Sequence, residues 1–454
     1  TWAAGEQWYP STDMTARPYA PFVQGQPAFN EADGRTLVAG MGAMLVPGSY
    51  VVGVIDSETT SGAAMSYTIA SRGIGVGLDP DGQPWAKPIT EVPWEGGAVQ
   101  FDDVTPRDTR YVKVTVPAGL EAVGYALDAL IGEAMLSVKK GQVPNSDPDV
   151  NSDSDTGTPV RRQKTGGEFF YRYVRSNETT LTPGDWYFML TSEGRDPNNT
   201  SYIGTQTSSF RFRSLGRLTP AGGIDRVVSP GQVQRFDGQQ LAFGEHKLYR
   251  FRLAADVPAV EIRLANRVGN PRMSAQLTSY FSTVVPSPSS QNYRAAVGGQ
   301  SNVGEDDVAL TIAGQPGDYT VDVWANREGS VDRDAQFDLV ITPRVLNVLP
   351  WRGGTAPLAL ATKETAFFQV DVPNDCDGVP LAGWLVTAED ASGTYTIRAR
   401  KDTLPGAPTG STTFTAADSQ VVVAPPYFGP GRWYVSIEAS TIANVTLKSE
   451  EIAE

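Results

Sequence analysis

Residues 183–192, Pro-Gly-Asp-Trp-Tyr-Phe-Met-Leu-Thr-Ser, form the stretch of sequence that decides the fold. Proline fixes φ and the following glycine tolerates positive φ, so this dipeptide predicts a tight turn. The aromatic residue after the turn opens a run with alternating apolar side chains, which is typical of a β-strand with one buried face. We therefore predict a turn followed directly by a strand.

The same pattern occurs four times along the chain, starting at Pro47, Pro183, Pro316 and Pro430. A pattern that recurs at long intervals predicts an array of similar structural units. We interpret the aromatic residues that occupy the equivalent place in each copy as structural core residues, and they are Tyr50, Trp186, Tyr319 and Trp433.

Alternating apolar runs surround each copy and predict further strands. A second strand follows each copy, and an opening strand precedes the last three copies, at residues 111–117, 249–253 and 367–373. We interpret the glycine pairs at 96–97, 222–223 and 353–354 as connectors between units. Short strands with regular turn signals and no sustained helical stripe predict an all-β fold, a tandem array of antiparallel, jelly-roll-like β-sandwiches. The expected units are an incomplete or divergent one at 1–76 and further sandwiches at 77–214, 215–343 and 344–454.

This arrangement of an aromatic opening strand, a long variable middle and a closing Pro-Gly-x-aromatic strand resembles the bacterial pre-peptidase C-terminal domain family. The resemblance implies a small β-sandwich of secreted proteins, often found after a peptidase domain. The acidic-apolar stretch that the family carries after its opening strand is matched most nearly by residues 125–128.

The first unit lacks an opening strand, because no matching run precedes Pro47. A sandwich without a strand exposes an apolar seam and unpaired edge groups. The gap could be filled by a cleaved precursor segment or by a strand from a neighbouring molecule, or the unit could be a divergent sandwich that folds alone. The first two alternatives predict a partner, either a precursor fragment or a homo-oligomer or polymer.

The composition narrows the possible chemistry. The 454 residues include one His, His246, and one Cys, which excludes paired-His zinc sites, intramolecular disulfides and CxxC motifs. Ser137 and Lys140 match the S-x-x-K pattern of serine nucleophiles, but we predict a strand there, in which the two side chains point to opposite faces. Charged neighbours place His246 on a wet strand edge. No catalytic constellation is found, and we expect a non-enzyme.

Acidic residues exceed basic ones by 51 to 37, which gives a net charge of −14 and disfavours nucleic-acid binding. Alternate positions of one loop carry oxygen ligands that suit calcium, although the spacing is not that of an EF-hand. These candidate ligands are Asp147, Asp149, Asn151, Asp153 and Asp155, and the alternative is a solvated acidic loop. Calcium is the one cofactor that we consider.

The longest uncharged stretch, residues 37–55, contains several glycines and a Pro-Gly turn, so we interpret it as two strands and expect no membrane span. The chain begins with Thr1, which we interpret as a processed end. We therefore expect a secreted or cell-surface, non-catalytic structural or adhesive protein, such as a filament or surface-layer subunit. The alternatives are the accessory C-terminal region of a secreted peptidase and a carbohydrate- or matrix-binding module.

Overall fold

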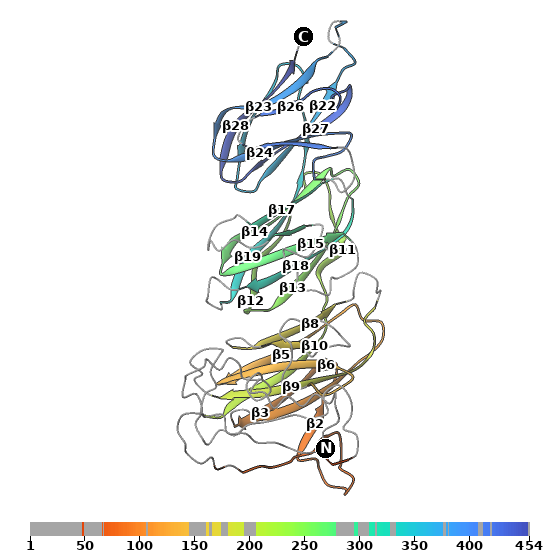
Figure 1. The fold of residues 1–454 in the computed structure, drawn as a ribbon, viewed down its shortest axis with the longest axis vertical. Helices are drawn as coiled ribbons and strands as arrows, with labels where there is room; N and C mark the ends of the chain where they lie inside the picture. Colours follow the sequence, from red (N-terminus) through yellow and green to blue (C-terminus); the bar gives the residue numbers. More distant parts are fainter. Residues whose placement is uncertain are drawn as a thin grey trace. The chain divides into compact units, whose positions relative to one another are not determined.

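The computed structural model describes most of the chain after residue 67, and its strands lie in stacked sheets (Figure 1). The described residues are 48–49, 66, 68–144, 160–173, 180–194, 206–277, 295–297, 308–326 and 333–452, with short gaps at 106–107, 163–165, 314–315, 376–377, 380, 407–411 and 418–419. Over these ranges the regular structure is β-strand, without a helix. The predicted all-β sandwich fold is confirmed. The predicted strands of unit 1–76 at 37–55, including Tyr50, lie outside the described residues except for positions 48–49.

The first sandwich consists of a six-stranded and a four-stranded sheet. The larger sheet has the order β1-β2-β4-β9-β6-β7, with bounds Ile74–Gly75, Lys87–Glu91, Thr109–Val116, Gly184–Gly194, Glu133–Lys140 and Val160–Arg162. The smaller sheet has the order β3-β10-β5-β8, with bounds Glu95–Val104, Ser208–Arg217, Ala122–Ile131 and Glu168–Tyr173.

The second sandwich consists of a five-stranded and a four-stranded sheet. The larger sheet has the order β11-β13-β18-β15-β16, with bounds Ala221–Val228, His246–Leu253, Gly317–Asn326, Asn270–Leu277 and Ala295–Val297. The smaller sheet has the order β12-β19-β14-β17, with bounds Gln234–Leu241, Ala335–Arg344, Ala259–Val268 and Val308–Ala313.

The third sandwich, like the second, consists of a five-stranded and a four-stranded sheet. Its larger sheet has the order β20-β22-β27-β24-β25, with bounds Leu346–Val348, Thr365–Val372, Gly431–Ala439, Tyr395–Lys401 and Thr413–Ala417. Its smaller sheet has the order β21-β28-β23-β26, with bounds Gly354–Leu360, Ala443–Ile452, Gly383–Ser392 and Gln420–Val423.

The three sandwiches share one topology. Apart from the additional edge strand β1, strand order in both sheets is the same when β2–β10, β11–β19 and β20–β28 are aligned. The register agrees as well, because the glycine of each Pro-Gly turn pairs with the last residue of the opening strand. These pairs are Val116 with Gly184, Leu253 with Gly317 and Val372 with Gly431. The sequence repeat therefore reflects a repeat of the whole sandwich.

The segments interpreted as connectors contain two strands in each sandwich. The first of them, β2, β11 or β20, runs parallel to the opening strand, and the second joins the opposite sheet. A chain that visits the other sheet between two neighbouring strands can return in the same direction, which explains the parallel pairing. The glycine pairs are also not equivalent, since Gly97 and Gly354 lie in β3 and β21 but Gly222 lies in β11.

Chain contacts divide the protein into two compact units, 1–218 and 219–454. The first sandwich lies in the first unit, and the second and third sandwiches lie together in the second unit. The unit boundaries expected at 77, 215 and 344 stay predictions.

Candidate functional site

The charged turn that precedes each opening strand is the most elaborate polar feature that all three sandwiches share. The residue before the opening strand is acidic in every case: Asp108, Glu245 and Glu364. Its backbone N–H donates to the carbonyl three residues earlier, at 3.0, 2.9 and 3.0 Å. Its own carbonyl accepts from the closing strand, from Ser192, Ala325 and Ala439. The acidic side chain is therefore held at a fixed place beside the sheet.

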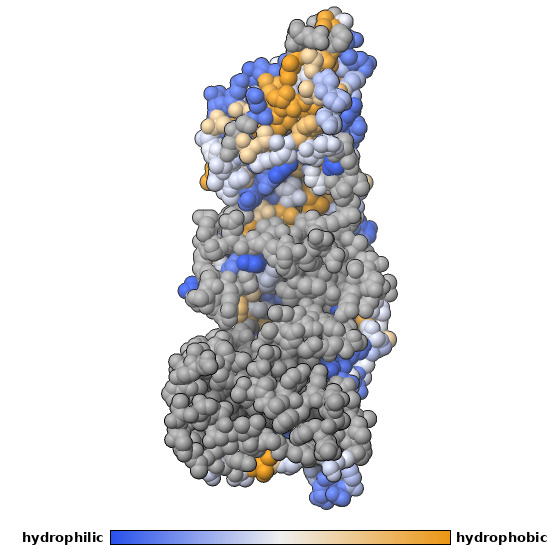
Figure 2. Space-filling view, viewed as in Figure 1, coloured by the Kyte–Doolittle hydropathy of each residue, from blue (hydrophilic) through white to orange (hydrophobic). Residues whose placement is uncertain are grey.

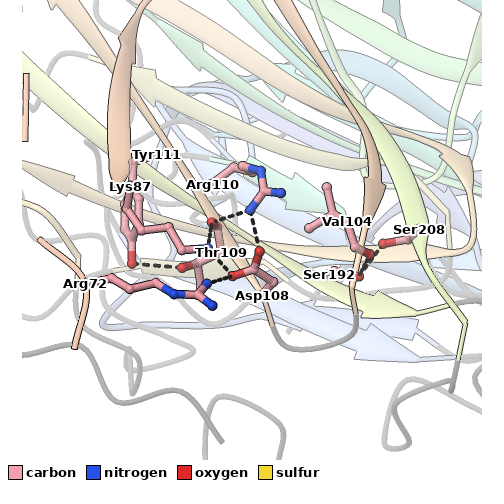
Figure 3. Close-up of polar contacts among 9 residues, drawn as sticks. All are labelled: Arg72, Lys87, Val104, Asp108, Thr109, Arg110, Tyr111, Ser192 and Ser208. Carbon is pink, nitrogen blue, oxygen red and sulfur yellow. Dashed lines mark hydrogen bonds and ion pairs between the residues drawn. The ribbon is translucent and has the colours of Figure 1, made fainter. Parts of the chain in front are cut away.

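In the first sandwich this acid is the centre of a cluster of cations (Figure 3). The ammonium of Lys87, from the first residue of β2, donates to Asp108 Oδ1, and Arg110 donates to Oδ2 at 2.6 Å. Arg72 reaches Oδ1 at 4.0 Å from a largely exposed position. Lys87 also donates to the carbonyl of Thr109 at 3.2 Å, so its ammonium has both a charged partner, Asp108, and a backbone acceptor.

Burial and ion pairing act against each other in this cluster. Burial acts to raise the pKa of Asp108, but the hydrogen bonds from Lys87 and Arg110 outweigh it and hold that pKa below its usual value. For Lys87 burial is the larger effect, and it lowers the pKa of the ammonium in spite of Asp108. Burial also raises the pKa of the neighbouring Tyr111 to about 12, and its hydroxyl accepts from Thr109 at 3.0 Å. Because both oxygens of the Asp108 carboxylate accept hydrogen bonds from cationic side chains, we interpret this carboxylate as a group that stabilises the turn rather than one that transfers protons.

The third sandwich carries the equivalent pair in a junction with the second sandwich. Arg344 is the last residue of β19 and stands two residues before β20, just as Lys87 stands two residues before Ile89. It donates to Glu364 Oε1 at 2.7 Å and, through its other nitrogen, to Glu261 in β14. Glu261 is almost fully buried and also accepts from Arg263 at 2.9 Å. Arg263 in turn donates to the carbonyl of Thr362, at 2.9 Å.

This junction therefore joins charged groups of both sandwiches in one network. Burial acts to lower the pKa of Arg344, but Glu261 and Glu364 together outweigh it and the pKa lies above its usual value. Arginine suits this role, because its planar fork can bind two carboxylates at once. Removing one member of such a buried network leaves the other charged groups without a partner. This lowers the free energy of unfolding far more than the loss of an exposed ion pair does.

An apolar cluster completes the junction. Ala259 and Ala313, at one end of the second sandwich, pack with Phe367 and Leu404 of the third, and two half-buried residues, Leu346 and Tyr434, join them. Phe367 lies on the face of its sheet that is turned away from the core, since Phe368 and Val370 occupy the core face. The end of the second sandwich is thus received on an outer sheet face of the third.

Other candidate groups are engaged in structural contacts. Ser137 and Lys140 lie in β6, as predicted, and the Ser137 hydroxyl is fully buried. His246 is not on a wet edge: its side chain is 6% exposed, it bonds Asp322 at 3.0 Å through Nδ1, and its ring stacks on Trp324. The expectation failed because Trp324 and Asp322 of the neighbouring strand cover the ring. Asp128, in the stretch related to the family's acidic segment, is bound by Arg211 and Arg213.

Buried hydroxyls provide a further link inside the first sandwich. Ser192 Oγ lies 2.5 Å from Ser208 Oγ and donates to the carbonyl of Val104 at 3.0 Å (Figure 3). These residues belong to β9, β10 and β3, so the contact connects the two sheets. With both hydroxyls buried and hydrogen-bonded, this pair has a structural role.

The predicted core aromatics lie inside the sandwiches. Trp186, Tyr319 and Trp433 are buried, and each occupies the third position of its closing strand. The predicted calcium ligands Asp147, Asp149, Asn151, Asp153 and Asp155 lie outside the described residues. Elsewhere, the described residues contain no group of three or more His, Cys, Asp or Glu side chains arranged for a metal.

Sequence reasoning missed the charged junction. One signal was available: a basic residue two positions before the apolar residue that pairs with the opening strand (Ile89 or Leu346), together with an acidic residue just before that opening strand. The two pairs are Lys87 with Asp108 and Arg344 with Glu364. The pairing needs the parallel strands β2 and β20, which the sequence pattern did not predict.

The third sandwich exposes large apolar side chains, and apolar atoms gather on the face of it seen in Figure 2. The large apolar side chains that are exposed in this sandwich or directly before it are Val345, Val348, Val379, Val422, Tyr427 and Ile442. Val379 lies in the loop between β22 and β23, and Tyr427 lies in the loop between β26 and β27. The corresponding loops of the second sandwich adjoin Ala259 and Ala313, which contact the third sandwich.

Comparison with models of known protein families finds no match, and neither does a search of curated proteins. Among solved structures, the CUB1-EGF-CUB2 domains of human MASP-1/3 are 11% identical, with a TM-score of 0.16, over 54% of this chain and 98% of that one. The VP2 subviral particle of infectious bursal disease virus is 9% identical, with a TM-score of 0.16, over 78% and 76%. A triple jelly-roll protein of an archaeal virus has the same identity and TM-score, over 78% and 82%. Likenesses of this size carry no information about function.

The described part of the chain also contains no helix that is long and apolar enough to cross a membrane.

Proposed function

We propose that this chain is a non-catalytic structural protein of the cell surface or the extracellular space, whose second and third β-sandwiches are coupled through a junction of buried charges and apolar side chains. The observation that carries the proposal is the network of Glu261, Arg344 and Glu364, with its apolar cluster, between two sandwiches. A buried charge network with several partners holds one mutual geometry, because any other arrangement leaves a charge unpaired. A protein that resists force or sets a distance between other components needs such a fixed geometry.

The chemistry of the described residues fits a structural role. The acidic groups with lowered pKa values, such as Asp108 and Asp128, are occupied by cations. Occupied carboxylates are poor general bases and poor metal ligands. The net charge of −14 and the weak helical periodicity agree with a soluble β-rich protein outside the cell.

Self-assembly is part of the proposal, with a second copy of the chain as the partner. The third sandwich exposes Val379 and Tyr427 in the two loops that correspond to those adjoining the contact end of the second sandwich. Exposed aromatic side chains at such an end are typical of protein interfaces. Contacts between different surfaces of identical subunits can propagate into filaments.

Light scattering and electron microscopy of the full chain test this proposal. We expect concentration-dependent assembly that the exposed-site variant Tyr427→Ser weakens by about tenfold or more in apparent dissociation constant. Val268→Ser, at an exposed apolar residue at the other end of β14 from Ala259, serves as the control and should assemble like the parent. A monomer at every concentration would contradict self-assembly, and an enzymatic activity of the purified chain would contradict the structural role.

A further inference from the structure

The third sandwich has an outer sheet face that corresponds to the face by which the second sandwich contacts the third. Strands β14, β17 and β19 of the second sandwich correspond to β23, β26 and β28 of the third. In the second sandwich Ala259 pairs with Arg344, the last residue of β19. In the third sandwich Gly383, the equivalent first residue of β23, pairs with Ile452, the last residue of β28. Each junction position of the second sandwich therefore has a counterpart in the third.

In the second sandwich, three positions of this face contact the third sandwich through polar or charged groups. Glu261 accepts from Arg344, which also donates to Glu364 of the third sandwich. Thr311 pairs with Glu261 in the sheet, and its hydroxyl lies 3.4 Å from the hydroxyl of Thr365 in the third sandwich. This face is thus matched to a partner surface that carries a carboxylate and a hydroxyl.

The same three positions are apolar in the third sandwich. The residues equivalent to Glu261, Thr311 and Arg344 are, in that order, Leu385, Val422 and Ile452.

These three side chains form an apolar patch on the outside of the smaller sheet. They are turned away from the core, because the alternate positions on the same strands, Val386, Val423 and Leu447, belong to it. Val422 is 47% exposed, and the other two side chains of the patch are half-buried. Figure 2 shows apolar atoms around the place where Figure 1 labels β23 and β26.

The charged side chains beside the patch are paired within the third sandwich. Lys448 binds Glu389 at 3.0 Å and Glu450 at 2.9 Å, and Glu450 is the neighbour of Leu385 across the strands. A partner of this patch therefore need not supply a charge, in contrast to the partner of Arg344. It needs to supply apolar surface, because apolar patches on a protein surface are typical of interaction sites.

We propose that this patch is an interface between two copies of the chain, in which each patch contacts the same patch of the other copy about a twofold axis. A twofold contact places a surface against itself, which suits an apolar patch whose neighbouring charges are already paired. The exposed Val379 and Tyr427 adjoin it, four residues before β23 and four residues after β26. This inference rests on the self-assembly proposed above and adds its surface and symmetry.

Opposite charges introduced at one position test the twofold contact in the full chain. Val422→Lys and Val422→Glu each place like charges on both sides of the interface, and each should raise the dissociation constant of the pair about tenfold or more. An equal mixture of the two variants brings opposite charges together and should associate more tightly than either variant alone. Sedimentation velocity at low salt measures the association, because salt screens such charges.

Val268→Lys is the matched control, because Val268 is an exposed valine on the second sandwich, outside the patch. This variant should associate like the parent. Near-ultraviolet circular dichroism verifies that all three variants remain folded.

Three results would count against the inference, and they are distinguishable. A parent chain that stays monomeric at every concentration would overturn the self-assembly and this inference with it. Association of the parent that neither Val422 variant weakens would overturn this inference alone, because another surface would then hold the copies together. Association that is weakened in both variants and not restored by mixing would overturn the twofold contact, because the patch would then meet a different surface.

Discussion

At the scale of single residues, three equivalent glycines allow the chain to turn from one sheet to the other. Gly132, Gly269 and Gly393 have φ values of +72°, +73° and +78°. A Cβ atom at these positions would lie 2.5, 2.4 and 2.1 Å from the backbone carbonyl oxygens of Gly194, Asp334 and Ile442, respectively. Glycine is required here both for its backbone conformation and for its size.

We expect Gly393→Ala to lower the free energy of unfolding of the third sandwich by about 2 kcal/mol or more, from backbone strain and the clash with Ile442. Gly378→Ala provides the control, because this glycine has a φ of +81° but open space around it. It should cost about 1 kcal/mol, from the backbone alone. Urea unfolding measures both values, and equal values would show that the clash is relieved.

The core aromatics give a second prediction at this scale. Trp186 packs against Phe170 at a ring distance of 5.8 Å and is buried within the first sandwich. Trp186→Ala should cost about 3–5 kcal/mol, because it removes a large buried side chain and leaves a cavity. Thermal unfolding of the first sandwich at the parent temperature would show that this tryptophan is not a core residue.

At the scale of elements, the charged turn before β4 makes the first sandwich sensitive to acid. The folded-state pKa of Asp108 lies below its ordinary value of 3.8, so the ion pairs stabilise the fold above that value. This contribution is lost as the pH falls through the lowered pKa of the folded state. Asp108→Asn should therefore be less stable than the parent at neutral pH, and the difference should shrink as the pH falls below 3.8 and through the lowered pKa of Asp108. Unfolding curves between pH 2 and 7 measure the difference, and a constant difference would contradict the role of the carboxylate.

The elements also show how far the sequence could predict the structure. Opening and closing strands were predictable, because alternation and the Pro-Gly turn depend on neighbouring residues. The parallel strands β2, β11 and β20 were not, because their pairing depends on a return from the opposite sheet. The predicted exposure of His246 was wrong for a related reason, because Asp322 and Trp324 contact it from a strand more than seventy residues away in the sequence.

At the scale of the whole molecule, the acidic loop gives a prediction about calcium that the described residues leave open. If the loop with Asp153 and Asp155 binds calcium, chelation should lower the melting temperature of the first sandwich, because a ligand that binds the folded state stabilises it. The double variant Asp153→Asn, Asp155→Asn should lose this response. An unchanged melting temperature of the parent on chelation would support the solvated loop instead.

The central claim is that the junction couples the second and third sandwiches, so that the two unfold together as one cooperative unit. Pulse-labelling hydrogen exchange during thermal unfolding tests it most directly, because peptides from β19 and β28 report the two sandwiches separately. In the parent protein we predict that both sets of peptides lose protection at the same temperature. In Arg344→Gln, which breaks the bond to Glu364, they should lose it at two different temperatures. Separate unfolding of the two sandwiches in the parent, unchanged by Arg344→Gln, would contradict the account.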